Sequence, residues 1–297
     1  MNKYLIFRTD RIGDFLLTAI LIKSIKRNDP GCNITIVSSE KNFKYINSFN
    51  IIDKVFFLEK GFFKKFKLFF LLNKHLYKSI IVHDSKNRSK IISFFLKSKK
   101  KYISNIIKFD SYFDEIINIL EYLNFNFDYK DLNTLENREI YYSKFDQKDY
   151  ILFHFDEKWI FNEYIKNYEN IEPSEQELKL FLTSLSLKLN KNIIVTTGNN
   201  TPKILSNVFK NNFIDNVNLI ENINFTDLES IINNSSLLIS CHGAVSHVAA
   251  AKNIKQIDVI DKSYNYEKWT KHFRNYKSIR RKSFNKLSFE ILNLNFI

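Results

Sequence analysis

The stretch YLIFRTDRIGDFLLT, residues 4–18, contains the change of pattern that decides the fold. An apolar run from Tyr4 to Thr9 is typical of a buried strand, whereas apolar residues from Phe15 to Arg27 recur at helical spacing. Gly13 and Asp14 stand where the strand would turn into the helix. A strand that passes through a short polar loop into a helix is the repeating unit of a parallel α/β sheet.

The same alternation continues along both halves of the chain. In the first half it predicts strands at 33–38, 54–58 and 79–83 and helices at 62–75, 89–96 and 112–123. Residues 124–147 lack clear periodicity. The second half predicts strands at 150–155, 192–197, 216–220, 236–240 and 256–260 and helices at 174–189, 227–232 and 244–252, with Ser174 and Glu177 as a capping box. The fold class is therefore α/β, with two Rossmann-like domains at 1–147 and 148–297.

Composition limits the classes of protein that fit. With 44% hydrophobic and 15% aromatic residues the chain is too apolar for disorder. Its two cysteines, Cys32 and Cys241, form no metal-ligand spacing, and no metal site is predicted. The sequence shows neither a signal peptide nor an apolar run long enough for a membrane span, so a cytoplasmic location is expected.

The net charge of +13 is concentrated, because residues 54–101 hold 14 lysines and arginines against two acids. A second basic stretch runs from Lys268 to Lys286. Such clusters attract phosphates on a lipid, a glycolipid or a nucleic acid, or they are solvated lysine-rich faces. In residues 62–70 phenylalanines interleave with lysines. They suit either a membrane interface or the buried stripe of an ordinary helix.

Four loops that follow predicted strands are candidates for chemistry, since ligands of open parallel sheets bind beyond the carboxyl ends of the strands. In the first, Gly13 would offer a backbone conformation closed to other residues, and Asp14 is either a helix cap or a functional carboxylate. In the second, Lys158 either reaches an anion or is an ordinary surface lysine, and the Trp159 ring would anchor the loop. The third loop contains Gly198. The fourth, SCHGAVSHVAAA at 240–251, combines small residues with two histidines at a helix N-terminus. This pattern suits a phosphate, or it reflects tight helix packing with structural histidines.

These motifs resemble glycosyltransferase family 9, the heptosyltransferase-like enzymes. The resemblance rests on residues 8–18 with their central Gly-Asp, on Lys158-Trp159, on Gly198 and on SCHGAVSHVAAAKNI at 240–254. It implies the GT-B fold, in which two Rossmann-like domains face each other across a cleft, the N-terminal domain receiving the acceptor and the C-terminal domain holding a nucleotide-sugar donor.

The resemblance also implies roles for individual residues. Asp14 matches the family's general base, and Lys158 matches the lysine that meets the donor phosphates. Donor binding is expected from Lys158, Gly198, Asn199, His242, Gly243, Ala244, Ser246 and His247, and acceptor binding from Arg8, Arg11 and Gly13. No metal or other cofactor is implied. The family commonly has Asp-Thr-Gly where this chain has His242-Gly243-Ala244, so the resemblance does not specify the donor sugar.

The sequence therefore predicts an inverting, metal-independent glycosyltransferase. Its partners would be a nucleotide-sugar donor and a lipid-linked or anionic glycan acceptor, such as lipopolysaccharide, at the inner face of the inner membrane. One alternative is a catalytically inactive GT-B protein that binds nucleotide or glycan. A nucleic-acid-binding protein is a further alternative, for which the chain lacks a recognisable binding module.

Overall fold

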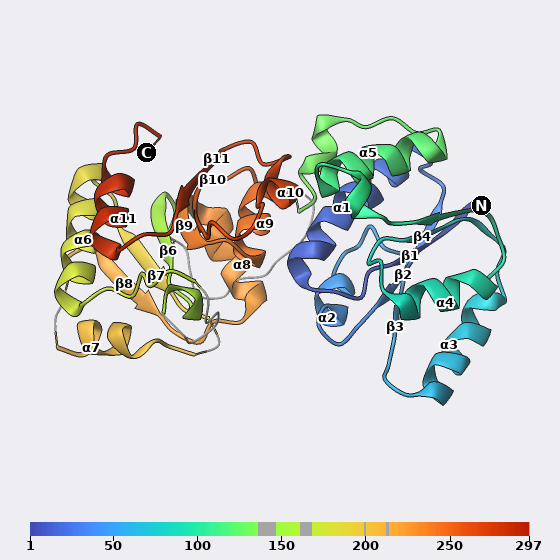
Figure 1. The fold of residues 1–297 in the computed structure, drawn as a ribbon, viewed down its shortest axis with the longest axis horizontal. Coiled ribbons are helices and arrows are strands. Elements are labelled where there is room, and N and C mark those ends of the chain that lie inside the picture. The colour runs from blue at the N-terminus through green and yellow to red at the C-terminus, as the bar shows by residue number, and fades with distance from the viewer. Residues whose placement is uncertain (136–146, 161–167, 199, 212–213, 297) are drawn as a thin grey trace. The chain divides into compact units, whose positions relative to one another are not determined.

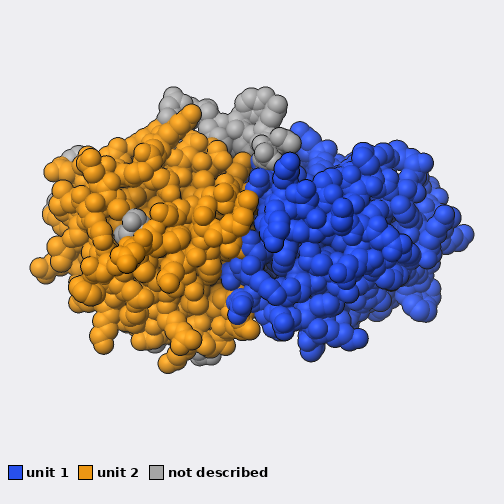
Figure 2. Space-filling model, turned by 90° about the horizontal axis from the view of Figure 1, so that it is seen from above, with its two compact units in different colours: residues 1–138, 267–272 blue, residues 139–266, 273–297 orange. Residues whose placement is uncertain are grey.

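The computed structural model describes residues 1–135, 147–160, 168–198, 200–211 and 214–296. Its contacts divide the chain into two compact units (Figure 2). The first unit comprises residues 1–138 and 267–272, and the second comprises residues 139–266 and 273–297. The short segment 267–272 thus belongs to the first unit although it lies far along the chain, with Trp269 against Tyr112 at a ring-centroid distance of 5.7 Å.

The first unit is built on a five-stranded sheet in which every pair is parallel. The strand order is β3-β2-β1-β4-β5. The strands are β1 (Lys3–Phe7), β2 (Asn33–Ser38), β3 (Lys54–Phe57), β4 (Tyr77–Val82) and β5 (Ser98–Ile103). The helices are α1 (Ile12–Asn28), α2 (Phe43–Ile46), α3 (Phe62–Asn73), α4 (Asn87–Phe95), η1 (Ile106–Lys108), α5 (Tyr112–Leu123), η2 (Tyr129–Leu132) and α10 (Glu267–Thr270).

Two of these helices share one face of the first sheet. Leu68 and Leu72 of α3, together with Ile92 of α4, join the core cluster that Leu5 and Phe7 of β1 form. Helix α1 contacts α5. The central strand β1 is almost wholly buried, as expected for a parallel strand that is covered by helices on both faces.

The second unit is built on a six-stranded sheet, again parallel throughout, with the order β11-β10-β9-β6-β7-β8 (Figure 1). The strands are β6 (Tyr150–His154), β7 (Ile193–Thr196), β8 (Val217–Ile220), β9 (Ser235–Cys241), β10 (Lys255–Ile260) and β11 (Tyr276–Arg280). The helices are η3 (Glu157–Trp159), α6 (Glu175–Leu189), α7 (Lys203–Asn211), α8 (Phe225–Asn234), α9 (Ala244–Ala251) and α11 (Phe284–Leu292).

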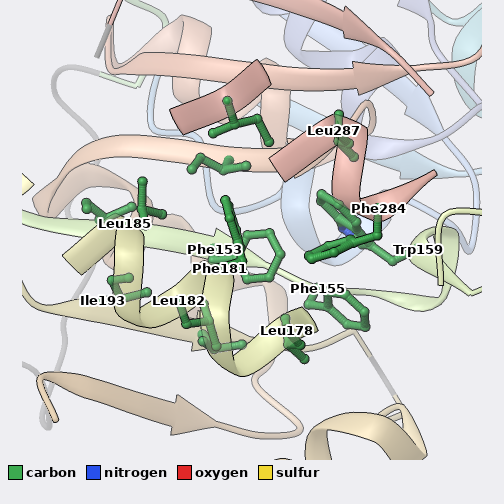
Figure 3. Close-up of a cluster of buried hydrophobic side chains, with 14 of the residues drawn as sticks. Phe153, Phe155, Trp159, Leu178, Phe181, Leu182, Leu185, Ile193, Phe284 and Leu287 are labelled. Atoms are coloured by element: carbon green, nitrogen blue, oxygen red, sulfur yellow. The ribbon is translucent and has the colours of Figure 1, made fainter. Parts of the chain in front are cut away.

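The core of the second unit is aromatic where the sheet meets α6 and α11 (Figure 3). Trp159 is wholly buried and stacks on Phe155 at 5.3 Å, while Phe181 of α6 packs against both Phe153 and Phe284. The expected anchoring of the loop by Trp159 is confirmed. The capping box is also confirmed, because the Ser174 hydroxyl accepts from the amide of Glu177, and the Glu177 carboxylate accepts from that of Ser174.

The expected α/β class with two Rossmann-like units and parallel sheets is confirmed, but several elements were not predicted. Strand β5 has the sequence SKKKYI, whose lysines conceal the alternation of an edge strand that is half exposed. Strand β11 was missed for the same reason, because it lies inside the second basic stretch. Helices α7 and α11 were also missed. Among the described residues no helix has the length and apolar character needed to cross a bilayer.

Candidate functional site

The strand order of the second unit decides which loops lie together. The chain places β7 and β8 on one side of β6 and then returns to place β9 on the other side. The loops that leave β6 and β9 therefore lie where the strand order reverses, at the carboxyl edge of the sheet, which is where open parallel sheets bind ligands. The first of these loops contains Lys158, and the second contains His242 and Gly243.

Lys158 joins the two loops. Its Nζ lies 2.9 Å from Oδ2 of Asp156 and donates to the carbonyl oxygens of Cys241 and His242 at 3.3 and 3.2 Å. Asp156 is the N-cap of η3, and its Oδ1 accepts from the amide of Lys158. Burial alone would lower the pKa of Lys158, but the negative charge of Asp156 reverses the effect and raises it. The site therefore holds a fixed ammonium that stays charged at neutral pH.

Two glycines leave room for this loop. A Cβ on Gly243 would meet Nζ of Lys158, so the ammonium would have to shift from its present place on the β9 loop. A Cβ on Gly198, just after β7, would lie 2.7 Å from Oε2 of Glu157 and would displace the end of that side chain. Both predicted donor-loop glycines thus lie against the ends of side chains from the β6 loop.

A buried carboxylate organises the β9 loop from the next strand. Asp258 of β10 is wholly buried, and its Oδ2 lies 2.8 Å from Nδ1 of His242. Its Oδ1 accepts from the hydroxyls of Ser240 and Ser246 at 3.1 and 2.7 Å. Because a carboxylate only accepts, Nδ1 of His242 carries the proton and Nε2 is left to bind a further group. Sequence reasoning missed Asp258, since an acid in the middle of an apolar strand is linked to the loop only by the fold.

The remaining predicted donor residues lie at the start of α9. Ala244 is its first residue, and the amide of Gly243 donates to the hydroxyl of Ser246 at 3.2 Å. His247 is largely buried, with its ring 5.6 Å from that of His242 and 5.3 Å from that of Phe273. The rings of the two histidines are thus neighbours, and their part in donor binding stays a prediction. Asn199 lies outside the described residues.

Arg281 is a further member of this edge that the sequence analysis did not single out. It follows β11, is 5% exposed, and donates from Nη1 to the carbonyl oxygen of Lys158 at 2.8 Å and from Nε to that of Glu169 at 3.1 Å. Its guanidinium lies 4.9 Å from the ring centre of Tyr168. The basic stretch 268–286 was the available signal, but Arg281 is the member of that stretch that is turned inward.

The first unit has a matching arrangement around the predicted base. Its strand order also reverses beside β1, so the loops after β1 and β4 lie together at the carboxyl edge. Asp14 is partly exposed in the first turn of α1, and its Oδ2 accepts from the amide of Arg11 at 3.2 Å. The carboxylate therefore does cap the helix, while part of it remains open to solvent. Arg11 is exposed.

Two expectations about this loop change. Gly13 was expected to supply an unusual backbone conformation, but it is a buried helical residue of α1, and Gly61 is the glycine with a positive φ in the described chain. Arg8 was expected to face an acceptor, yet it is 1% exposed. Its Nε donates to Thr18 at 2.6 Å and its Nη1 to the carbonyl oxygen of His83 at 2.8 Å. Arg8 thus braces the β1 loop against the β4 loop, and contact with an acceptor remains a prediction for it.

A second carboxylate, Asp10, lies in the same loop and was not predicted as a site residue. Its Oδ2 is 3.7 Å from Nη1 of Arg8. Burial raises the pKa of Asp10 to about 6, against the lowering effect of Arg8. Asp84 after β4 is buried and accepts from the hydroxyls of Thr9 and Ser89 at 2.5 and 2.7 Å. The β1 loop and the first turn of α1 thus contain two carboxylates, Asp10 and Asp14, and the β4 loop adds a third, Asp84, which is fully engaged.

The structure therefore gathers the predicted donor residues on the second unit and the predicted base on the first. No group of three potential metal ligands occurs among the residues that the structure describes.

Comparisons with known proteins agree on the fold. A scan against protein-family models finds no match, and a search of curated protein sequences finds none either. Solved structures do match. The E. coli heptosyltransferase WaaC with ADP aligns over 97% of this chain and 98% of its own, with a TM-score of 0.73 and 14% identity.

Two further solved structures match this chain with lower TM-scores. A family 9 glycosyltransferase from Veillonella parvula gives a TM-score of 0.69 at 13% identity, covering 98% of this chain and 88% of its own. The UDP-GlcNAc 2-epimerase from Methanocaldococcus jannaschii gives 0.56 at 12% identity, covering 100% and 94%. The expected GT-B fold, and with it the resemblance to family 9 at the level of the fold, is confirmed. Because the fold is shared with an epimerase, it does not by itself specify the reaction.

Proposed function

We propose that the protein is an inverting glycosyltransferase that moves a sugar from a nucleotide-diphosphate donor to a hydroxyl of lipopolysaccharide or a related surface-glycan acceptor. One observation carries the proposal. Lys158 is a charged ammonium held between the β6 and β9 loops, at the reversal of strand order where this type of sheet binds nucleotides. It is suited to a diphosphate, whose negative charge grows as the bond to the sugar breaks.

The chemistry requires one base and one leaving group. The acceptor hydroxyl attacks the anomeric carbon, Asp14 takes its proton, and the nucleoside diphosphate leaves with the bonding electron pair. Attack opposite the leaving group inverts the anomeric carbon. Lys158 and the start of α9 offset the charge of the diphosphate, and Gly198, Asn199, His242 and His247 complete the proposed donor site. Arg8, Arg11 and Gly13 shape the acceptor side, and neither a metal nor another cofactor takes part.

The proposed acceptor determines where the enzyme would act. A growing lipopolysaccharide core is anchored in the inner leaflet, so the enzyme would act in the cytoplasm as a peripheral protein of the inner membrane. Its solved structural neighbours include a heptosyltransferase with ADP, which supports a nucleotide-sugar donor. The alternative is an inactive GT-B protein that binds the nucleotide without transfer.

The deciding experiment separates binding from transfer. The protein is first screened with nucleoside diphosphates, ADP and UDP among them, for thermal stabilisation. Release of that nucleoside diphosphate from the matching nucleotide sugars is then followed with lipopolysaccharide cores as acceptors. We expect Asp14→Asn to bind the nucleoside diphosphate as the wild type does and to lose transfer by at least about 100-fold, the contribution of a general base.

Asp10→Asn is the matched control, because it removes the neighbouring carboxylate from the same loop. An active Asp14→Asn variant beside an inactive Asp10→Asn variant would move the base to Asp10. Nucleotide binding by a wild-type protein that transfers no sugar to any core would favour the inactive binder.

A further inference from the structure

The outward faces of α3 and α4 are aromatic. Phe62, Phe63, Phe66 and Phe70 of α3 are 75%, 85%, 50% and 52% exposed, and Phe94 and Phe95 of α4 are 74% and 63% exposed. We call these six residues the aromatic surface. The interpretation of the α3 phenylalanines as a buried stripe is wrong for these four, because Leu68 and Leu72 form that stripe instead. Single exposed phenylalanines are common, but a group of six marks an interaction site.

The six rings belong to one side of the first unit. Leu72 of α3 and Ile92 of α4 lie in the same core cluster, so both helices cover the same face of the sheet and turn their other sides to solvent. Phe62 stacks along Phe66 at 6.1 Å, and Phe66 meets Phe70 edge to face at 4.5 Å. Each ring packs on its neighbour, so the row forms a continuous apolar ridge along α3.

Residues 54–101, which include the aromatic surface, carry a large net positive charge. Every residue from 54 to 101 is described, and the two acids in this range are both engaged. Glu59 pairs with Lys64, and Asp84 is buried. The lysines remain at the surface, among them the exposed Lys60, Lys67 and Lys99. An apolar ridge bordered by cations suits a surface that offers both hydrocarbon and negative charge.

We propose that the aromatic surface docks the protein on an anionic lipid bilayer, with the phenylalanine rings entering the interface and the lysines meeting the lipid phosphates. A second copy of this chain fits less well, because it would bring two lysine-rich faces together and add like charges. The inference rests on the proposed function in one respect only, namely that the membrane would present the lipid-linked acceptor. Vesicle binding needs neither donor nor transfer, so either proposal can fail without the other.

Part of the aromatic surface lies toward the edge of the first sheet that bears Asp14. Helix α3 begins with Phe62 and Phe63 after β3 ends at Phe57, so these two rings lie toward the carboxyl edge of the sheet. The loop from β1 to α1, which contains Asp14, leaves the same edge because β1 is parallel to β2 and β2 to β3. Phe94 and Phe95 instead stand at the end of α4, just before β5 begins, and so lie toward the opposite edge of the sheet. The aromatic surface thus reaches from one edge to the other, and only docking through its Phe62 and Phe63 end would bring the Asp14 edge toward an acceptor anchored in the bilayer.

The test is co-flotation of the full-length protein with vesicles of phosphatidylcholine alone or mixed with phosphatidylglycerol. We expect binding to the mixed vesicles, weakened by high salt because exposed charges are screened. Phe62→Ser/Phe66→Ser/Phe94→Ser should lower the partition coefficient by at least roughly 100-fold, from about tenfold for each ring that enters the interface. Lys60→Glu/Lys67→Glu/Lys99→Glu should lose binding to the anionic vesicles, since each lysine near such a surface contributes about fivefold.

Matched controls come from the second unit. Leu180→Ser/Leu187→Ser removes two side chains of α6 that are 67% and 75% exposed, and Lys203→Glu/Lys210→Glu/Lys286→Glu makes the same change in net charge. Both controls should float as the wild type does. A wild-type protein that stays unbound at low salt, or controls that lose as much as the test variants, would overturn the proposal. The proposal would also be overturned if the wild-type protein binds no vesicles but forms a dimer in solution that the phenylalanine variant dissociates.

Discussion

Replacing Lys158 separates its structural role from its role toward a ligand. The Lys158→Met variant keeps most of the stem but leaves the carboxylate of Asp156, whose side chain is 8% exposed, without the ammonium 2.9 Å away. Breaking a buried ion pair by removing one partner costs about 3–5 kcal/mol. Because the Lys158 side chain is 16% exposed, we expect about 3 kcal/mol, at the lower end of that range.

The double variant Asp156→Asn/Lys158→Met removes both charges while asparagine retains the oxygen that caps η3. We therefore expect it to recover at least about 2 kcal/mol of the lost stability, since an ion pair replaced as a whole is often neutral. Affinity for the nucleoside diphosphate should not recover. Losing one charge-assisted contact to phosphate is worth about 1.5–3 kcal/mol, or roughly 10–100-fold in Kd, in both variants.

The assay uses the two tryptophans of the chain. In a Trp269→Phe background, urea unfolding followed by Trp159 fluorescence reports on the second unit alone, and calorimetric titration gives Kd for ADP or UDP. Wild-type affinity in the double variant would remove Lys158 from the donor site. A double variant no more stable than the single one would show that the Asp156 charge is not the cause of the instability.

Two further predictions concern groups around the donor loops. Burial lowers the pKa of His154 to about 4. Between pH about 6.5 and 4 the unfolded chain therefore binds a proton that the folded chain does not. The free energy of unfolding should fall by about 3 kcal/mol as the pH drops through this window. His154→Asn should flatten that part of the pH profile in urea unfolding of the second unit, and an unchanged slope would contradict it. In Asp258→Asn the asparagine amide should donate to Nδ1 of His242, so the ring proton moves to Nε2. Because Nε2 then no longer accepts a hydrogen bond, we expect the affinity for the nucleoside diphosphate to fall about tenfold. Affinity equal to that of the wild type would show that His242 does not touch the donor.

The fold was predictable because local pattern and tertiary environment agree in most elements. Strand β1 reads as an apolar run and is buried, and α6 has its cap residues in sequence. Prediction failed where charge hides the pattern. In β5, Lys99 and Lys101 are exposed while Ser98, Lys100 and Tyr102 are half buried, a true alternation that a run of lysines conceals.

The site was predictable only where a residue adjoins a recognisable loop. Lys158 and Gly243 could be named because each follows a strand within a motif, but their contact is a property of neighbouring strands β6 and β9. Asp258 and Arg281 enter the site from β10 and the end of β11. Nothing in the sequence around Asp258 points to the site, and the basic stretch around Arg281 does not show which of its members is turned inward. Likewise, periodicity cannot tell which apolar residues of α3 face the sheet when leucine and phenylalanine occupy both sides.

The β9 loop suggests how this chain differs from the family that it resembles. Where the family commonly has an acid, His242 occupies the position, and the nearest carboxylate stands one strand away as Asp258, bonded to Nδ1 of the histidine. Nδ1 of the imidazole is thus taken by the carboxylate, and Nε2 is the ring nitrogen left for a ligand in the proposed donor site. A carboxylate can only accept hydrogen bonds from sugar hydroxyls, whereas an imidazole accepts when neutral and donates when protonated. We therefore expect this loop to prefer another donor than a loop with the acid. His242→Asp restores the acid only by placing it beside Asp258, where two carboxylates repel each other. The pair has to be exchanged together for the donor preference to change.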